Sequence, residues 1–122
     1  MMREILFRGK RADNGEWATS PYPYGTMSSD TMIHDFILDT VGEYTGMTDK
    51  NGVKIFEGDI VLKRIYNGKK PIPVTFHNGM FHCGWGGGSS TATHAYTLND
   101  KQIEVIGNIY DNPELVGGDK NA

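Results

Sequence analysis

The segment from Asp39 to Arg64, DTVGEYTGMTDKNGVKIFEGDIVLKR, decides the fold of this chain. Its apolar and β-branched residues come in short runs, and each run ends at a turn residue. The dipeptide Asn51-Gly52 readily takes the positive φ angles of a tight hairpin turn. Gly58-Asp59, directly before Ile60-Val61-Leu62, is typical of a turn that leads into a buried strand. The segment therefore predicts a small, strongly twisted β-sheet, and it contains no signature of a particular reaction.

The flanking sequence continues this alternation of short strands and turns. We expect strands at residues 4–10, 16–19, 60–66, 73–77, 80–83 and 102–110. The first two would form an N-terminal hairpin around Asp13-Asn14-Gly15, and Asn78-Gly79 would close another. Gly107, inside the last strand, indicates a bulge or a close backbone approach. Asn112 and Pro113 then predict a short helical turn, with Asn112 as its cap.

Two regions fit more than one kind of structure. Residues 26–39 fit either a short hairpin or one helical turn, because periodicity does not distinguish them in runs this short. We favour strands there, since the neighbouring elements are strands. Residues 91–98 are expected to form a further strand, although Ala92 and Ala95 also allow a helix.

Three motifs of the chain resemble one known family. TVGEYTGMTDKNGVKIFEGDIV (residues 40–61) closely resembles the signature of the phage YopX protein family, and the resemblance continues in MREILFRGKR (2–11) and IEVIGNIYDNPEL (103–115). It implies a protein from a bacteriophage or an integrated prophage, with a β-barrel core of SH3-like character. It implies no biochemical activity that can be transferred to these residues.

The expected fold class is thus mainly β. We expect a small SH3-like β-barrel of short antiparallel strands, with an N-terminal hairpin and a short C-terminal helical turn. Residues 1–116 are expected to form a single YopX-like domain, and residues 117–122 a flexible C-terminal tail.

Composition points to the cytoplasm, which for the phage protein implied by the resemblance means that of the bacterial host cell. The chain has 122 residues and a single cysteine, Cys83, which cannot form an intrachain disulfide. No apolar run approaches the roughly 20 residues that span a bilayer, and the start Met-Met-Arg-Glu lacks the apolar core of a secretion signal. We therefore expect no membrane association.

The net charge bears on nucleic-acid binding. Acidic residues number 15 and basic residues 12, which gives a formal net charge of −3. Because nonspecific nucleic-acid binding depends on Lys and Arg, this balance disfavours it. Basic residues nevertheless gather in two groups, which are Arg3, Arg8, Lys10 and Arg11, and Lys63, Arg64, Lys69 and Lys70. We favour solvated strand edges for both groups, and retain Arg8, Lys10 and Arg11 as possible nucleic-acid contacts.

Potential catalytic and metal-binding groups have simpler structural explanations. His77 and His82 would lie on one face of their hairpin, but two histidines fall short of the three or four ligands of a zinc site. Glu57 and Asp59 flank a glycine, where a carboxylate usually accepts backbone N–H bonds. Cys83 would point to the opposite face from His82, so the two cannot share a proton directly. The glycines of residues 84–88 lack the Lys and the helix start of a phosphate-binding loop. We therefore predict no catalytic residue, no metal ligand and no cofactor.

The aromatic residues divide into a core set and a loop set. Those expected in the core are Phe7, Trp17, Tyr44, Phe56, Phe76, Phe81 and Tyr110. Tyr22, Tyr24 and Trp85 fall in expected loops, where they would either form an interaction surface or cover the open ends of the barrel. The two prolines Pro21 and Pro23 exclude a central strand in this loop.

The function that we predict is that of a non-enzymatic phage accessory protein, a protein-interaction or self-assembly module. Its partner would be another protein or a second copy of the chain, because exposed sheet edges invite pairing. The alternatives are a nucleic-acid-binding β-barrel module and, less favoured, a small metal-dependent enzyme.

Overall fold

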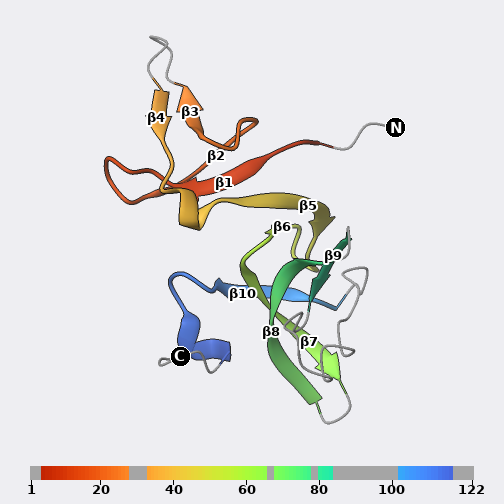
Figure 1. Cartoon of the computed structure of the whole chain (residues 1–122). Helices are drawn as coiled ribbons and strands as arrows, with labels where there is room; N and C mark the ends of the chain where they lie inside the picture. The colour runs from red at the N-terminus through yellow and green to blue at the C-terminus, as the bar shows by residue number, and fades with distance from the viewer. Residues whose placement is uncertain (1–3, 28–32, 66–67, 78–79, 84–101, 117–122) are drawn as a thin grey trace. The chain divides into compact units, whose positions relative to one another are not determined.

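The computed structural model describes residues 4–27, 33–65, 68–77, 80–83 and 102–116. The chain divides into two compact units, Met1–Gly46 and Met47–Ala122. Its described elements are mainly antiparallel strands with a few short 3₁₀ turns (Figure 1). They are β1 (Phe7–Lys10), β2 (Trp17–Ser20), β3 (Gly25–Met27), β4 (Ile33–Asp35), η1 (Leu38–Thr40), β5 (Gly42–Thr48), β6 (Lys54–Phe56), β7 (Asp59–Ile65), β8 (Gly68–His77), β9 (Met80–Cys83), β10 (Glu104–Asn108) and η3 (Pro113–Val116).

The first unit is built on the predicted N-terminal hairpin, which is confirmed. Strands β1 and β2 pair antiparallel, with Phe7 opposite Ser20 and Lys10 opposite Trp17. The Asn14 side chain accepts the Glu16 N–H at 2.9 Å and so stabilises the turn between the strands. On its other side β1 pairs with the start of β5.

Residues 26–39 contain both of the structures that the sequence allows. The prediction of strands is confirmed for the β3–β4 pair, in which Thr26 lies opposite His34. It is wrong for Leu38 and Asp39, which belong to the 3₁₀ turn η1. Buried Thr40 explains the difference, because its hydroxyl donates to the Ile37 carbonyl at 2.6 Å and accepts the Lys10 N–H at 2.9 Å. This side chain closes a local turn and attaches it to β1.

The predicted turn at Asn51-Gly52 is confirmed between β5 and β6. The Asp49 N–H donates to the Val53 carbonyl at 2.8 Å, and the Gly52 N–H donates to the Asp49 carbonyl at 3.0 Å. The loop therefore has three residues, and its last residue, Gly52, has a φ of 83°. A β-turn followed by a residue in the left-handed region is a common three-residue hairpin loop, and glycine takes that conformation without strain.

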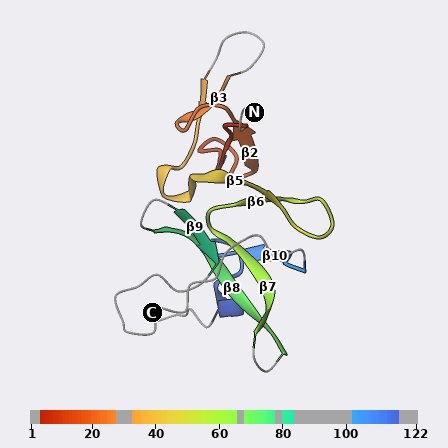
Figure 2. The ribbon, with the colours of Figure 1, turned by 90° about the vertical axis from the view of Figure 1, so that its right-hand side faces the viewer.

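In the second unit, four strands form a sheet in the order β10-β7-β8-β9 (Figure 2). The hairpin around residues 78–79 has the predicted register, with Thr75 opposite His82. Strand β8 begins at Gly68, before the predicted start at Pro73, so it includes Pro71 as well as Pro73. The Val74 carbonyl accepts the Gly58 N–H, so the backbone N–H and C=O groups of Val74 point toward β7. These groups point to opposite sides in successive strand residues, so the backbone groups of Pro71 and Pro73 point away from β7. The prolines thus remove no bond from the β7–β8 ladder.

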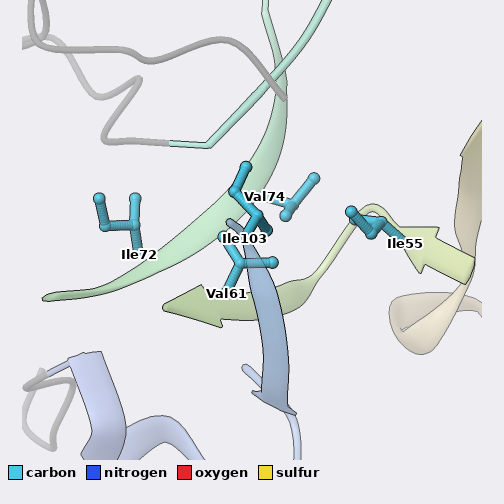
Figure 3. Packing of buried hydrophobic residues seen from close by; sticks show 5 residues of the cluster. All are labelled: Ile55, Val61, Ile72, Val74 and Ile103. Atoms are coloured by element: carbon cyan, nitrogen blue, oxygen red, sulfur yellow. The ribbon is translucent and has the colours of Figure 1, made fainter. Parts of the chain in front are cut away.

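The core of this unit is a cluster of β-branched side chains (Figure 3). Its members are Ile55, Val61, Ile72, Val74 and Ile103, and Met47, Phe81 and Val105 pack against them. Phe56 and Tyr44 are buried as expected. Phe76 is a correction, because 53% of it is exposed. It lies near the end of β8, where its ring centroid is 4.9 Å from that of Phe81. It does not belong to the buried cluster.

The last two described elements are of the kinds that the sequence predicts, a strand and a short helical turn. The register of β10 shifts between Val105 and Gly107, at the glycine for which the sequence predicts a bulge or a close backbone approach. The predicted C-terminal helical turn is η3. The Asn112 side chain does not cap it as predicted, since its Oδ1 accepts the Asn108 N–H at 3.2 Å. Its backbone carbonyl accepts the Leu115 N–H instead.

Some sequence expectations concern features that the structure does not reach. The described strands form sheets, none of which closes into a barrel within the described ranges, so the SH3-like barrel and the single domain over 1–116 stay predictions. Trp85, the glycines of 84–88, residues 91–98 and the tail at 117–122 lie outside the described residues. In the described part of the chain, no helix has the length and apolarity needed to cross a membrane.

Candidate interaction surfaces

The loop after β2 presents two tyrosine side chains to solvent. Tyr22 is 41% exposed and Tyr24 is 48% exposed, and their rings stack with centroids 5.6 Å apart and planes 21° apart. Pro21 and Pro23 restrict the backbone on either side of Tyr22. The loop is also anchored at both ends, because the Tyr22 N–H donates to Oγ of buried Ser20 at 3.0 Å and the Tyr24 carbonyl accepts the Phe36 N–H at 3.0 Å. The two predicted interaction residues in this loop therefore form one pre-ordered aromatic pair.

Two of the three predicted nucleic-acid contacts come together on the N-terminal hairpin. Arg8 and Lys10 are two residues apart in β1, so their side chains lie on the same face of the strand. Trp17 lies directly across from Lys10 on β2, and its side chain shares this face. The Arg8 guanidinium carbon lies 4.7 Å from the Trp17 ring centroid, and the Lys10 Nζ lies 5.3 Å from it. Cation–π attraction holds two positive charges on one indole ring, where they could bind an anion.

Arg11 is separated from this pair. Its guanidinium donates to both carboxylate oxygens of Asp13, with Nε and Oδ1 at 3.0 Å. Because β1 alternates, residue 11 also falls on the face opposite to Arg8 and Lys10. On that face a Cβ added to Gly9 would lie 2.8 Å from Cγ of Phe36. The Phe36 ring therefore covers that face of β1.

At the Glu57-Gly58-Asp59 turn, the Asp59 carboxylate bonds to the backbone. Asp59 is 1% exposed, and its Oδ2 accepts the Phe56 N–H at 2.8 Å. This bond closes the turn that places Ile60 and Val61 in the core, which is the role expected of a turn carboxylate.

Asp49, whose carboxylate accepts three backbone N–H groups, is absent from the sequence-based candidates. Its Oδ1 accepts the N–H groups of Asn51 and Val53, at 2.8 and 2.9 Å, and its Oδ2 accepts the Val105 N–H at 2.9 Å. Burial raises the pKa of this carboxyl, but the three N–H bonds and the charge of Lys50 outweigh burial and lower the pKa below its ordinary value. An Asp two residues before an Asn-Gly dipeptide is a recognisable turn signal, but its bond to Val105 spans 56 residues and has no local signature.

Metal ligation finds no support in the described side chains. Among them, no group of three or more His, Cys, Asp or Glu residues is placed to hold a metal ion. The register opposes His77 to Met80 and His82 to Thr75, as predicted.

Comparisons with known proteins place the chain in a family. The crystal structure of protein EF1440 from Enterococcus faecalis is similar, with a TM-score of 0.57 and 23% sequence identity over 94% of this chain and 99% of that chain. A likeness at this identity shows a shared fold. No curated protein matches the chain. The model of the YopX protein family matches residues 6–117, and the chain therefore belongs to the YopX protein family.

Proposed function

We propose that the chain is a non-enzymatic protein-interaction or self-assembly module. The observation that supports this proposal is the stacked pair Tyr22 and Tyr24, exposed on a loop that two prolines and two hydrogen bonds fix. Tyrosine is enriched among the residues that dominate binding energy at interfaces. A pre-ordered loop also loses less conformational entropy on binding than a mobile one.

The experiment compares a double variant with its conservative counterpart. Y22S/Y24S removes both rings, and Y22F/Y24F retains them without the hydroxyl groups. We expect Y22S/Y24S to lose self-association in light scattering, or to lose the protein that tagged wild type captures from host cells. The expected weakening is at least about tenfold, since an interface anchor contributes about 2 kcal/mol or more.

Y22F/Y24F is expected to stay within about threefold of wild type, because most of the buried ring area remains. The proposal fails if wild type is a monomer at high concentration and captures nothing. It also fails if Y22S/Y24S associates as well as wild type does.

The finer features of the prediction extend the same proposal. We propose an SH3-like barrel as the scaffold, and a phage or prophage protein that acts in the bacterial cytoplasm as a homo-oligomer or with a protein partner. The family membership and the single cysteine support this proposal.

A nucleic-acid-binding module is the second candidate, because Arg8 and Lys10 meet on Trp17. It predicts binding that weakens with salt and that R8Q/K10Q impairs. No described contact favours the third candidate, a metal-dependent enzyme, and metal analysis of the purified protein tests it.

A further inference from the structure

The hairpin of β7 and β8 extends beyond the rest of its sheet. Strand β10 pairs with Asp59 to Leu62 of β7, and β9 pairs with Val74 to His77 of β8. Residues 63–65 and 68–70 pair with each other as strands, beyond the positions where β10 and β9 pair within the described ranges. Figure 2 shows these ends of β7 and β8, in green, running on together as a two-stranded ribbon. We call residues 63–65 and 68–70 the β7–β8 arm.

The register of the arm places like charges directly opposite each other. Lys63 lies across from Lys70, and Arg64 lies across from Lys69. Like charges in such positions repel and destabilise a strand pair. Arg64, Lys69 and Lys70 are exposed, and the sequence from Ile60 to Ile72 contains no Asp or Glu. The arm thus concentrates four basic residues without an acidic residue along its own strands.

The positive charges occupy both faces of the ribbon. Cross-strand partners share a face, and successive residues alternate between faces. Lys63 and Lys70 therefore lie on one face, and Arg64 and Lys69 lie on the other. A flat anionic surface, or a single acidic strand, would meet only one of these pairs. A groove with negative charge on both walls would meet both.

We propose that the β7–β8 arm binds the phosphate backbone of duplex DNA, entering the major groove. That groove is about 12 Å wide and admits a two-stranded β-ribbon. Phosphates line both of its walls, so each face of the arm would meet one backbone. The net charge of −3 does not prevent this contact, because charges more than about 10 Å apart are largely screened at 0.1 M salt. This inference is independent of the tyrosine pair.

The test measures binding of the full chain to a fluorescent duplex of about 20 base pairs by anisotropy, between about 50 and 200 mM salt. For four phosphate contacts, the plot of log K against log salt is expected to have a slope of about −3.6, since each contact contributes about −0.9. K63Q/K70Q and R64Q/K69Q each remove the two positive charges from one face of the arm. Each variant is expected to reduce the steepness of the slope by about 1.8. Both variants should melt no lower than wild type, because they relieve like-charge repulsion.

The matched control is K50Q/K54Q, which removes two positive charges from the β5–β6 hairpin, outside both basic groups, and is expected to leave duplex binding unchanged. An equal loss in this control would overturn the assignment to the arm. Loss from only one of the two face variants would overturn binding to both walls. Absence of duplex binding at about 50 mM salt would overturn the inference altogether, including the case in which phosphatidylserine vesicles bind instead.

Discussion

At the scale of single residues, the buried carboxylates of this protein hold backbone segments together. Asp59 accepts the Phe56 N–H within its own turn. Asp49 accepts two within its turn and a third from Val105 in β10. The neighbouring Lys50 adds a second link to β10, because its N–H donates to the Ile103 carbonyl and its Nζ lies 3.6 Å from Oε1 of Glu104. Asp49 and Lys50 therefore join the β5–β6 turn to the start of β10.

Replacing Asp49 by Asn should destabilise the fold. The amide has one acceptor oxygen where the carboxylate has two, and its NH₂ group would face a backbone N–H. We expect a loss of about 2 to 3 kcal/mol in the free energy of unfolding at neutral pH, typical of hydrogen bonds to a charged group. Urea unfolding followed by circular dichroism measures it. D13N, which changes an exposed carboxylate, is the control and should cost under about 1 kcal/mol.

The same variant has a predictable pH dependence. Because the pKa of Asp49 is lowered in the folded state, its carboxylate stabilises the fold fully above the unfolded pKa of about 3.9. That contribution is lost as the pH falls through the folded pKa. The difference in stability between wild type and D49N should thus be constant from about pH 5 to pH 7 and shrink below about pH 4. A difference that stayed constant to pH 2 would show that the carboxylate is not the stabilising group.

At the scale of elements, turns set the register of the strands. The β5–β6 loop shows this most simply, since Gly52 takes a φ of 83° and a Cβ added there would meet nothing within 4 Å. Any loss of stability caused by a side chain at this position therefore comes from the positive φ angle of the backbone and not from contact with neighbouring atoms.

Gly52→Val should accordingly lower stability by about 1 to 3 kcal/mol, because a β-branched residue resists positive φ. Gly52→Asn is the matched control and should cost less, since asparagine tolerates the left-handed region. Thermal melting of the two variants compares them. Equal melting temperatures for G52V and wild type would place the turn elsewhere in the chain.

Elements with local signals could be predicted from the sequence, and those that depend on distant contacts could not. The hairpins around Asp13-Asn14-Gly15 and residues 78–79 have turn residues that determine their pairing locally. The 3₁₀ turn η1, which the sequence allows but does not favour, depends on the bond of Thr40 to Lys10, 30 residues earlier. The exposure of Phe76 was missed because apolar character alone does not show where a core ends.

The candidate surfaces divide in the same way. Tyr22 and Tyr24 were recognisable from the prolines beside them, which exclude a central strand. The grouping of Arg8 and Lys10 on Trp17 required the register of the hairpin, and so did the opposed charges of the β7–β8 arm.

At the scale of the whole molecule, four buried polar side chains serve turns and strand junctions, namely Ser20, Thr40, Asp49 and Asp59. Aromatic and basic side chains are presented on a loop and a ribbon. Such a division suits a protein that binds other molecules through its exposed loop and arm. The central claim is that binding occurs at these exposed segments and not at the buried carboxylates.

Amide chemical-shift mapping by NMR tests this claim most directly. Spectra are recorded across a dilution series of the chain, with the captured protein partner, and with the duplex. We expect shifts to be largest at Ser20, Tyr22, Tyr24 and Gly25 for self-association or a protein partner, and at Lys63, Arg64, Lys69 and Lys70 for the duplex. Shifts centred instead on the amides around Asp49 and Asp59, with the loop and arm unchanged, would contradict the account.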